Sequence, residues 1–337
     1  MKRVTIEDVA REANISPATV SRALRNNGYV SMENRNVIHA AVKKLGYVPN
    51  KVARGLRNQK TNLLGHVMGL NSENPLNSRM ADAMHEIFEK AGYHVITAMI
   101  KDSGGYGRTV IEDLLGQMVE AIIFNAIVKC DNEVINKVIS QGVPVVMIER
   151  SLDIDGIGVI SLDSIEGAGI ATRHLIENGH KKISYIGVSP EFDIVEVHRY
   201  AGYRQTMAAA GLAIPEHLVY LTPDYSIEFG FEAMQSIYEK GDLPTAIFAT
   251  SDLLASGALQ CLYQHRIRVP EDISIVGYDN TLSHSCAPPL SSIEMHPDQI
   301  GLATLKMIQE RSEKPYGAAS HINILPTLID RGSVRLL

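Results

Sequence analysis

The sequence predicts a small all-α helix-turn-helix domain with a hinge helix, followed by an α/β body of two doubly wound parallel-sheet subdomains. Residues 5–46 show the i, i+3, i+4 spacing of apolar side chains that is typical of helices. From residue 63 onward, nearly continuous apolar runs alternate with amphipathic segments, as in parallel sheets covered by helices on both faces. The formal charge also changes sign between these two regions.

The first predicted helix begins after Thr5, a good N-cap residue, with Asp8 in the place of a capping-box acid. A short turn follows this helix. The second helix begins after Ser16, with Pro17 in its first turn, where a missing N–H costs nothing. The apolar face of the first helix consists of Ile6, Val9, Ala10 and Ala13.

The second helix has two contrasting faces. Val20, Ala23 and Leu24 point toward the first helix, whereas the outer face carries Ala18, Ser21, Arg22 and Arg25. Two short helices joined by a tight turn form a helix-turn-helix. Guanidinium groups can bond guanine edges or phosphates, and small residues permit close approach to a major groove. A helical hairpin that merely packs is the alternative interpretation.

A third helix is predicted between the cap residue Ser31 and the terminating Gly46. Its apolar stripe consists of Val37, Ile38, Ala41, Val42 and Leu45. Three helices of this length bury one small core, so residues 1–46 are expected to form a self-contained module.

Residues 47–61 are expected to form a hinge. Pro49 interrupts the chain, and only about two helical turns follow, with the unfavourable Gly55 among them. A helix this short is marginal in water and should form only when something holds it. The basic residues along it, which point to phosphate as the binding group, are Lys51, Arg54 and Arg57.

The charge distribution supports nucleic acid as the partner of the amino-terminal part. Residues 1–60 contain 12 Lys and Arg against 4 Asp and Glu, a formal charge of +8. The whole chain carries −6, so the remaining residues carry −14. A basic end on an acidic body is the electrostatic footprint of a nucleic-acid-binding module confined to that end.

The chain resembles the DNA-binding end of the lactose/galactose repressor (LacI/GalR) family in the segments VTIEDVAREANISPATVSRALRN and YVPNKVARGLR. The T-x-x-D-V-A, T-V-S-R and P-N-x-x-A-R-x-L elements occur in order and at the family's spacing. The resemblance implies base contacts from Pro17, Ala18 and Arg22, and a hinge helix that inserts Leu56 into the minor groove beside Ala53. The DNA-binding residues expected in full are Thr5, Ser16, Pro17, Ala18, Thr19, Ser21, Arg22, Asn26, Tyr47, Asn50, Ala53, Arg54 and Leu56.

Composition restricts the remaining classes of protein. No apolar run is long enough to span a bilayer, and the start of the chain lacks the apolar region of a signal peptide. The three cysteines, Cys130, Cys261 and Cys286, are scattered and have no metal-ligand spacing. We therefore expect a reduced cytoplasmic protein without disulfides, metal, cofactor or membrane partner.

The body is expected to contain two similar α/β halves. Strands are predicted at 63–70, 94–100, 120–128 and 144–149, and then at 159–163, 182–188, near 219, 245–250 and 273–279, with helices between them. The expected domains are 1–46, the hinge 47–61, and the body 62–337. The body is divided into one subdomain of 62–160 with 292–322 and another of 161–291 with 323–337.

Doubly wound sheets bind ligands at the carboxyl ends of their strands, so a cleft between the two sheets is the natural ligand site. Polar and charged residues follow several predicted strands: Asn71, Ser72, Glu149, Arg150, Asp163, Ser251, Asp252 and Asp279. The alternative is that each one caps the next helix, which is the role we expect for Asp252 and also consider for Asp163.

The resemblance covers essentially the whole chain and implies a body similar to periplasmic sugar-binding proteins. Arg199 in HRYAGY matches the family's ligand arginine, and Asp279 in VGYDN its ligand carboxylate. A carboxylate and a guanidinium can each bond two adjacent hydroxyls, while an aromatic face covers a sugar's C–H surface. Ser251 stands where some sugar repressors have an amide, and residues 192–196 follow no consensus. The effector-binding residues expected are Asn71, Glu149, Arg150, Arg199, Tyr225, Ser251 and Asp279.

Together these features predict a homodimeric repressor of sugar utilisation that binds operator DNA and is controlled by a small sugar-like effector. A purine- or nucleoside-responsive regulator of the same family is the first alternative. A periplasmic-type binding protein or a sugar-acting enzyme is the alternative from another class. The chain has no G-x-S-x-G, H-E-x-x-H or C-x-x-C motif, so we expect no enzymatic activity.

Overall fold

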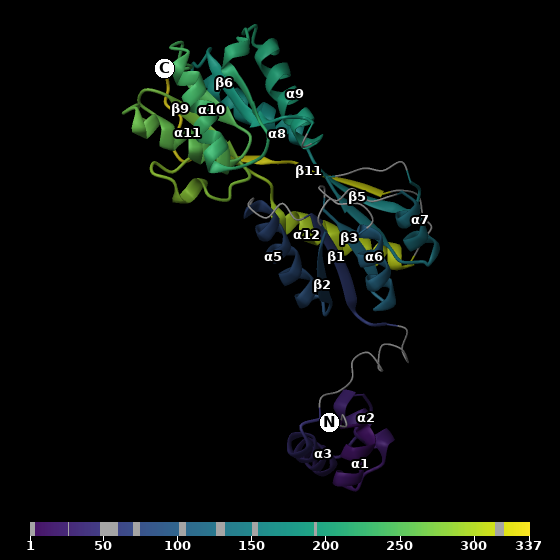
Figure 1. Ribbon diagram of the computed structural model, residues 1–337. Helices are drawn as coiled ribbons and strands as arrows, with labels where there is room; N and C mark the ends of the chain where they lie inside the picture. The colour runs from purple at the N-terminus through teal and green to yellow at the C-terminus, as the bar shows by residue number, and fades with distance from the viewer. Residues whose placement is uncertain are drawn as a thin grey trace. The chain divides into compact units, whose positions relative to one another are not determined.

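The computed structural model describes residues 4–25, 27–47, 60–69, 75–100, 106–125, 132–149, 154–191, 194–313 and 320–337. The chain divides into two compact units, Met1–Thr61 and Asn62–Leu337, which are described separately (Figure 1). The predicted hinge residues 48–59 lie outside the described residues.

The first unit contains three helices, α1 (Ile6–Ala13), α2 (Pro17–Arg25) and α3 (Met32–Leu45). The capping box predicted at Thr5 and Asp8 is confirmed, because the side chain of each residue bonds the backbone N–H of the other. Ser31 caps α3 through Asn34 N, and Gly46 ends that helix in the left-handed conformation. The core that the helices share consists of Val9, Ala10, Ala13, Val20, Ala23, Val30, Ile38 and Ala41.

One residue of the predicted apolar stripe on α3 is not in this core. Val37 is 42% exposed, whereas its neighbour Ile38 is fully buried. Successive residues of an α-helix point about 100° apart, so a stripe centred on Ile38, Ala41 and Leu45 leaves Val37 at its edge. The prediction for Val37 was wrong for this reason.

The second unit contains two six-stranded sheets. The strands of the first sheet, which are all parallel, lie in the order β11-β5-β4-β3-β1-β2. Helices α5 and α12 pack on one face of this sheet, and α6 and α7 on the other. The elements are β1 (Leu63–Gly69), α5 (Pro75–Lys90), β2 (His94–Ile100), α6 (Tyr106–Gly116), β3 (Ala121–Phe124), α7 (Asn132–Ser140), β4 (Val145–Ile148), β5 (Ile157–Leu162), α12 (Pro297–Glu313) and β11 (Ser320–Ile324).

The second sheet has the order β12-β10-β9-β8-β6-β7, and only the β10–β12 pair is antiparallel. Helices α8 and α9 pack together on one face, and α10 and α11 on the other. The elements are α8 (Ser164–Glu177), β6 (Ile183–Val188), α9 (Ile194–Ala209), η1 (Glu216–Leu218), β7 (Val219–Thr222), α10 (Ile227–Glu239), β8 (Ala246–Ala249), α11 (Asp252–Gln264), β9 (Ser274–Tyr278), η2 (Ser283–Ser285), β10 (Ser291–Glu294) and β12 (Thr327–Ile329).

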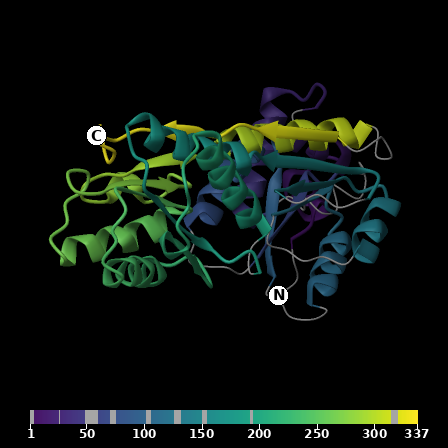
Figure 2. The ribbon, with the colours of Figure 1, turned by 90° about the horizontal axis from the view of Figure 1, so that it is seen from above.

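These two sheets confirm the predicted fold class of a helical domain followed by two doubly wound halves. The chain passes between the sheets after β5, after β10 and after β11 (Figure 2). In each sheet the strand order reverses between two central strands, β1 and β3 in the first and β6 and β8 in the second, where doubly wound folds place their ligands. Within the described parts of the chain, no helix is long and apolar enough to cross a membrane.

Candidate functional site

The outer face of α2 is the predicted DNA-reading surface, and it is accessible. Ser16, Pro17, Ala18 and Arg22 are exposed, and Thr19 and Ser21 are half-buried. The Arg22 Nη2 atom donates to Thr19 Oγ1 at 3.1 Å, and Thr19 Oγ1 lies 2.9 Å from Ser16 Oγ. These two contacts orient the Arg22 side chain.

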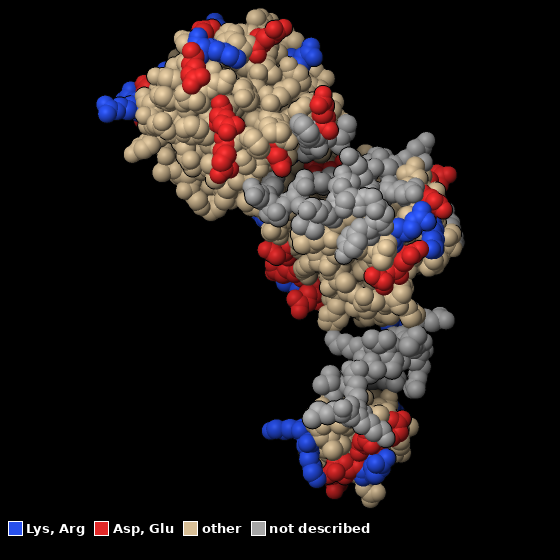
Figure 3. All heavy atoms as spheres, in the orientation of Figure 1, with Lys and Arg blue, Asp and Glu red and all other residues tan. Residues whose placement is uncertain are grey.

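Acidic and basic side chains stand together on the first unit (Figure 3). Glu12 is paired with Lys44 at 2.6 Å, and Asp8 with Arg11 at 3.4 Å. Pairing of these two acids leaves the outer face of α2, which carries no acidic residue, as an uncompensated cationic surface.

The remaining predicted DNA-binding residues differ in their surroundings. Thr5 is an exposed cap, and Tyr47 is half-buried and packs against the helical core. The others, Asn26, Asn50, Ala53, Arg54 and Leu56, lie outside the described residues.

In the second unit, Arg199 and Asp279 meet at the carboxyl ends of β6, β8 and β9. Both side chains are buried, with 4% and 1% exposed. The Arg199 Nη2 atom lies 3.4 Å from Asp279 Oδ1, and its Nη1 donates to Thr250 O at 2.7 Å. The guanidinium also lies over the ring of Tyr278, 4.1 Å from the centroid. Two residues 80 positions apart therefore meet in one buried polar cluster. We call Arg199, Asp279 and the groups bonded to them the effector floor, because both residues were predicted to bind the effector.

Glu196 is a member of the effector floor that the sequence analysis did not predict. It is fully buried on α9, three residues before Arg199, and its Oε1 lies 3.3 Å from Arg199 Nη1. The spacing i, i+3 on a helix puts an acid and a base on one face and could have revealed the pair. Tyr225, which the family resemblance implies as the stacking aromatic, donates its hydroxyl to Glu196 Oε1 at 2.9 Å.

The surroundings of Asp279 on the floor make its carboxyl group easier to protonate. Burial raises the pKa of its carboxyl to about 7, against the opposing effect of Arg199. The charges of Asp252, Glu149 and Glu196 contribute to the same rise, and the pKa of about 7 is the net result of all these effects. Glu149, which follows β4 in the other sheet and adopts a positive φ of 63°, is thus close enough to act on Asp279.

Two acids at strand ends have structural roles that differ from each other. Asp163 caps α8 by accepting from Glu166 N at 2.9 Å, as the alternative interpretation expected. The cap of α11 is Ser251, through Leu254 N, so the expectation that Asp252 provides this cap was wrong. Asp252 instead accepts from three successive backbone N–H groups, those of residues 281–283, because its buried carboxylate reaches the loop after β9.

Arg79 joins the effector floor to the first sheet's helices. From α5, its Nη1 donates to the backbone oxygens of Asp279 and Asn280 at 3.1 and 3.0 Å. Its Nη2 lies 2.6 Å from Glu294 Oε2, at the end of β10. Movement of α5 relative to the second sheet must therefore stretch or break bonds to the backbone of Asp279.

The other predicted effector residues, Asn71 and Arg150, lie outside the described residues. Among the described residues, no group of three or more His, Cys, Asp or Glu side chains is arranged to hold a metal ion.

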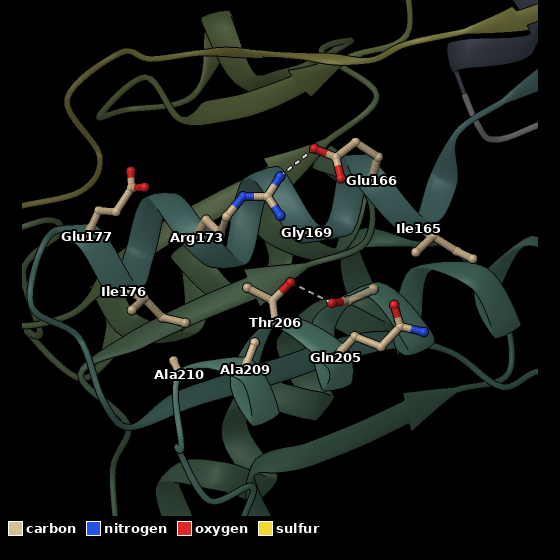
Figure 4. A pocket seen from close by; sticks show the side chains of 11 residues that line it. Ile165, Glu166, Gly169, Arg173, Ile176, Glu177, Gln205, Thr206, Ala209 and Ala210 are labelled. Carbon is tan, nitrogen blue, oxygen red and sulfur yellow. Dashed lines mark hydrogen bonds and ion pairs between the residues drawn. The ribbon is translucent and has the colours of Figure 1, made fainter.

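A separate surface groove of about 460 Å³ lies between α8 and α9 (Figure 4). Arg173 points along the groove to Glu166, and both side chains are about half-exposed. The small residues Gly169, Ala209 and Ala210 line part of the wall, together with Ile165, Ile176, Glu177, Gln205 and Thr206. The groove has none of the buried charges that mark the effector floor.

Two family descriptions match the chain. Residues 5–50 match "Bacterial regulatory proteins, lacI family", and residues 172–334 match "Periplasmic binding protein-like domain". Catabolite control protein A of Priestia megaterium is 30% identical over 92% of this chain and 93% of its own length. The transcriptional repressor PurR of Klebsiella pneumoniae (strain 342) is also 30% identical, over 98% of this chain and 96% of its own. The ribose operon repressor of Escherichia coli K12 is 29% identical over 98% and 99%.

Solved structures agree in fold over nearly the full chain. The lac repressor dimer bound to operator and an anti-inducer superposes with a TM-score of 0.84 at 26% identity, over 99% of this chain and 100% of that one. A complex of the transcriptional regulator CelR with cellobiose gives a TM-score of 0.71 at 28% identity, over 98% and 100%. The proteins in these comparisons are regulators rather than enzymes, in agreement with the prediction that this chain is not an enzyme.

Proposed function

This chain belongs to the lacI family of bacterial regulatory proteins, and on that premise we propose how it acts. A homodimer binds operator DNA and represses genes of sugar utilisation, under the control of a small molecule held on the effector floor. The support for operator and dimer is the similar lac repressor dimer bound to operator. The support for a sugar is the similarity to a ribose operon repressor and to a regulator complexed with cellobiose.

The observation that carries the proposal is the buried contact between Arg199 and Asp279. Buried charged side chains are normally paired, and groups whose pKa is perturbed by burial and by a specific charged partner cluster at functional sites. Here the pair lies where the strand order of the second sheet reverses, which is where doubly wound folds bind ligands. Hydroxyl groups of a polyol match such a pair, because a carboxylate and a guanidinium each bond two neighbouring hydroxyls.

Coupling to DNA is proposed to run through the hinge, residues 47–61. Two turns of helix are marginal alone and can fold in the minor groove, with Leu56 as the apolar wedge. An effector that favours one arrangement of the two sheets would change the spacing of the two hinges in a dimer, and hence operator affinity. The bonds from Arg79 to the backbone beside Asp279 are a direct route for this change.

The test is a titration of labelled operator duplex with the full-length protein, with and without a candidate effector. We expect Asp279→Ala to keep operator binding but to lose the effect of the effector. An unchanged response would remove the effector floor from the mechanism. Failure of the wild-type protein to prefer any duplex would remove the operator assignment.

A purine effector is the competing candidate, because the chain is 30% identical to a PurR repressor over most of its length. A thermal-shift screen against sugars and purines discriminates the two, because a ligand that binds only the folded state raises the melting temperature by mass action. Stabilisation by a purine alone would replace the sugar in the proposed function.

A further inference from the structure

Glu196 lies at the centre of the effector floor, and its surroundings are built for a carboxylate. Four groups donate hydrogen bonds to it. Arg199 Nη1 and the Tyr225 hydroxyl reach Oε1 at 3.3 and 2.9 Å. The Tyr185 hydroxyl and Val188 N reach Oε2 at 3.0 and 3.2 Å. Donors on every side stabilise the ionised form of a buried carboxylate.

Strand β6 makes room for this carboxylate. A Cβ atom at Gly187 would lie 2.6 Å from Glu196 Oε2 and equally close to the Tyr185 ring, so any larger residue would displace them. The backbone of β6 can therefore approach Glu196 closely only because residue 187 is glycine.

Glu196 reduces the positive charge that Arg199 can offer to a ligand. Arg199 is bonded to the carboxyl groups of Glu196 and Asp279, and the charge of Glu149 acts on Asp279 in turn. Arg79, the cation on the other side of Asp279, is itself paired with Glu294. Among the described residues of the floor, the positive charge of Arg199 is thus already matched by the carboxylate of Glu196.

An anionic ligand group would meet the Glu196 carboxylate with no unmatched cation to receive it among the described residues of the floor, at distances where water screens poorly. Hydrogen-bond donors on a ligand, by contrast, would find an acceptor on the floor. Among the described residues, both Asp279 Oδ2 and Arg199 Nε are buried without a hydrogen-bond partner, and a ligand hydroxyl could donate to the first and accept from the second. A hydroxyl or a protonated amine could supply the missing donor.

We propose that Glu196 is a specificity-determining residue, which neutralises Arg199 and makes the effector floor reject anions. The buried end of the effector then carries hydroxyls or a protonated amine, and no phosphate or carboxylate. This inference rests on the proposed function only in taking the Arg199–Asp279 contact as the place where the effector binds.

The first test uses the wild-type, full-length protein and a matched series of probes at constant ionic strength. The series consists of glucose, glucosamine, glucuronate and glucose 6-phosphate, together with the corresponding ribose compounds and inorganic phosphate. We expect each anionic probe to raise the melting temperature no more than its neutral parent compound does. An anionic probe that binds ten-fold more tightly than its parent would overturn the proposal.

The second test removes the negative charge of Glu196. In Glu196→Gln the amide oxygen can still accept from Tyr185 and Val188, while Arg199 loses one counter-charge. Inorganic phosphate and glucose 6-phosphate should then bind saturably, with dissociation constants at least ten-fold lower than for the wild type. Addition of Arg199→Gln should abolish this gain.

Glu166→Gln is the matched control, because it removes the partner of an arginine in the exposed α8–α9 groove. Phosphate binding should not change there. A folded Glu196→Gln protein that gains no phosphate binding would assign Glu196 a purely structural role and overturn the proposal. Should that variant not fold, the wild-type series alone decides the question.

The outcome is separable from the proposed function. Loss of the regulatory assignment would appear as absence of operator binding, which phosphate titration does not measure. Rejection of anions by the wild type, with their acceptance by Glu196→Gln, would stand even then as a property of the floor.

Discussion

The helical unit and the α/β body place their functional side chains in opposite environments. On α2, Arg22 is exposed and donates to the hydroxyl of Thr19. On the effector floor, Arg199 is buried between two carboxylates, a backbone oxygen and an aromatic ring. Substitutions on the DNA-reading surface should therefore change the stability of the fold little, whereas substitutions on the effector floor should disturb the core that surrounds it.

The largest effect should follow from Arg199→Met. Loss of the guanidinium leaves Glu196 and Asp279 buried without their shared counter-charge, and breaking a buried ion pair costs about 3–5 kcal/mol of unfolding free energy. Urea unfolding followed by circular dichroism should show a lower midpoint with an unchanged slope. A loss below about 1 kcal/mol, the range of exposed pairs, would mean that the floor is not part of the core.

Arg22→Ala should show the reverse behaviour. We expect operator binding to weaken by about 1–3 kcal/mol with relaxed specificity at one base position, while the urea midpoint stays the same. Anisotropy titrations against single-base operator variants measure this. Arg11→Ala, on the exposed side of α1, is the control and should change specificity at no position. An equal loss on all duplexes for Arg22→Ala would assign it to phosphate.

Asp279→Asn should stabilise the body at alkaline pH. The pKa of Asp279 is about 7 in the folded protein against 3.8 for an ordinary Asp, so the folded state keeps a proton that the unfolded chain has released between these values. This group therefore contributes stability at low pH that is lost as pH rises through 7. We expect a higher melting temperature for the variant at pH 8 and a smaller difference at pH 5.

The melting temperature should rise by a few degrees for each kcal/mol of unfolding free energy gained, because about 1 kcal/mol corresponds to about 2–4 °C in a domain of this size. Thermal melts across the pH range provide the measurement. A variant that is less stable than the wild type at pH 8 would show that Arg199 compensates the Asp279 carboxylate fully.

The smallest expected effect is at Thr5. Thr5→Ala removes both the side-chain cap and its reciprocal bond with Asp8, and loss of an N-cap costs about 1 kcal/mol. Amide hydrogen exchange in α1 should speed up accordingly, with no change in the body. Ser31→Ala, which loses a single cap bond on α3, should give the same effect or less. Faster exchange in the body would contradict the independence of the two units.

Features that depend on near neighbours along the chain could be predicted from the amino-acid sequence. Helices α1 to α3 and their caps at Thr5, Ser16 and Ser31 follow from residues three or four positions apart, as do the alternating strands and helices up to residue 279. The later elements β10, α12, β11 and β12 were not predicted. They include the strands by which the chain returns to both sheets, and such pairing depends on segments far away in the sequence.

The contacts of each polar residue at a strand end could be read only from the tertiary structure. Asp163 and Asp252 look alike in the sequence, yet one caps a helix and the other holds the loop after β9. Tyr225 donates to Glu196, and Glu196 itself became visible as part of the effector floor only beside Arg199, Tyr185 and Asp279. The physical reason is burial: removal from water makes each charge depend on the partners that the fold brings within hydrogen-bond distance. No spacing along the chain records those partners.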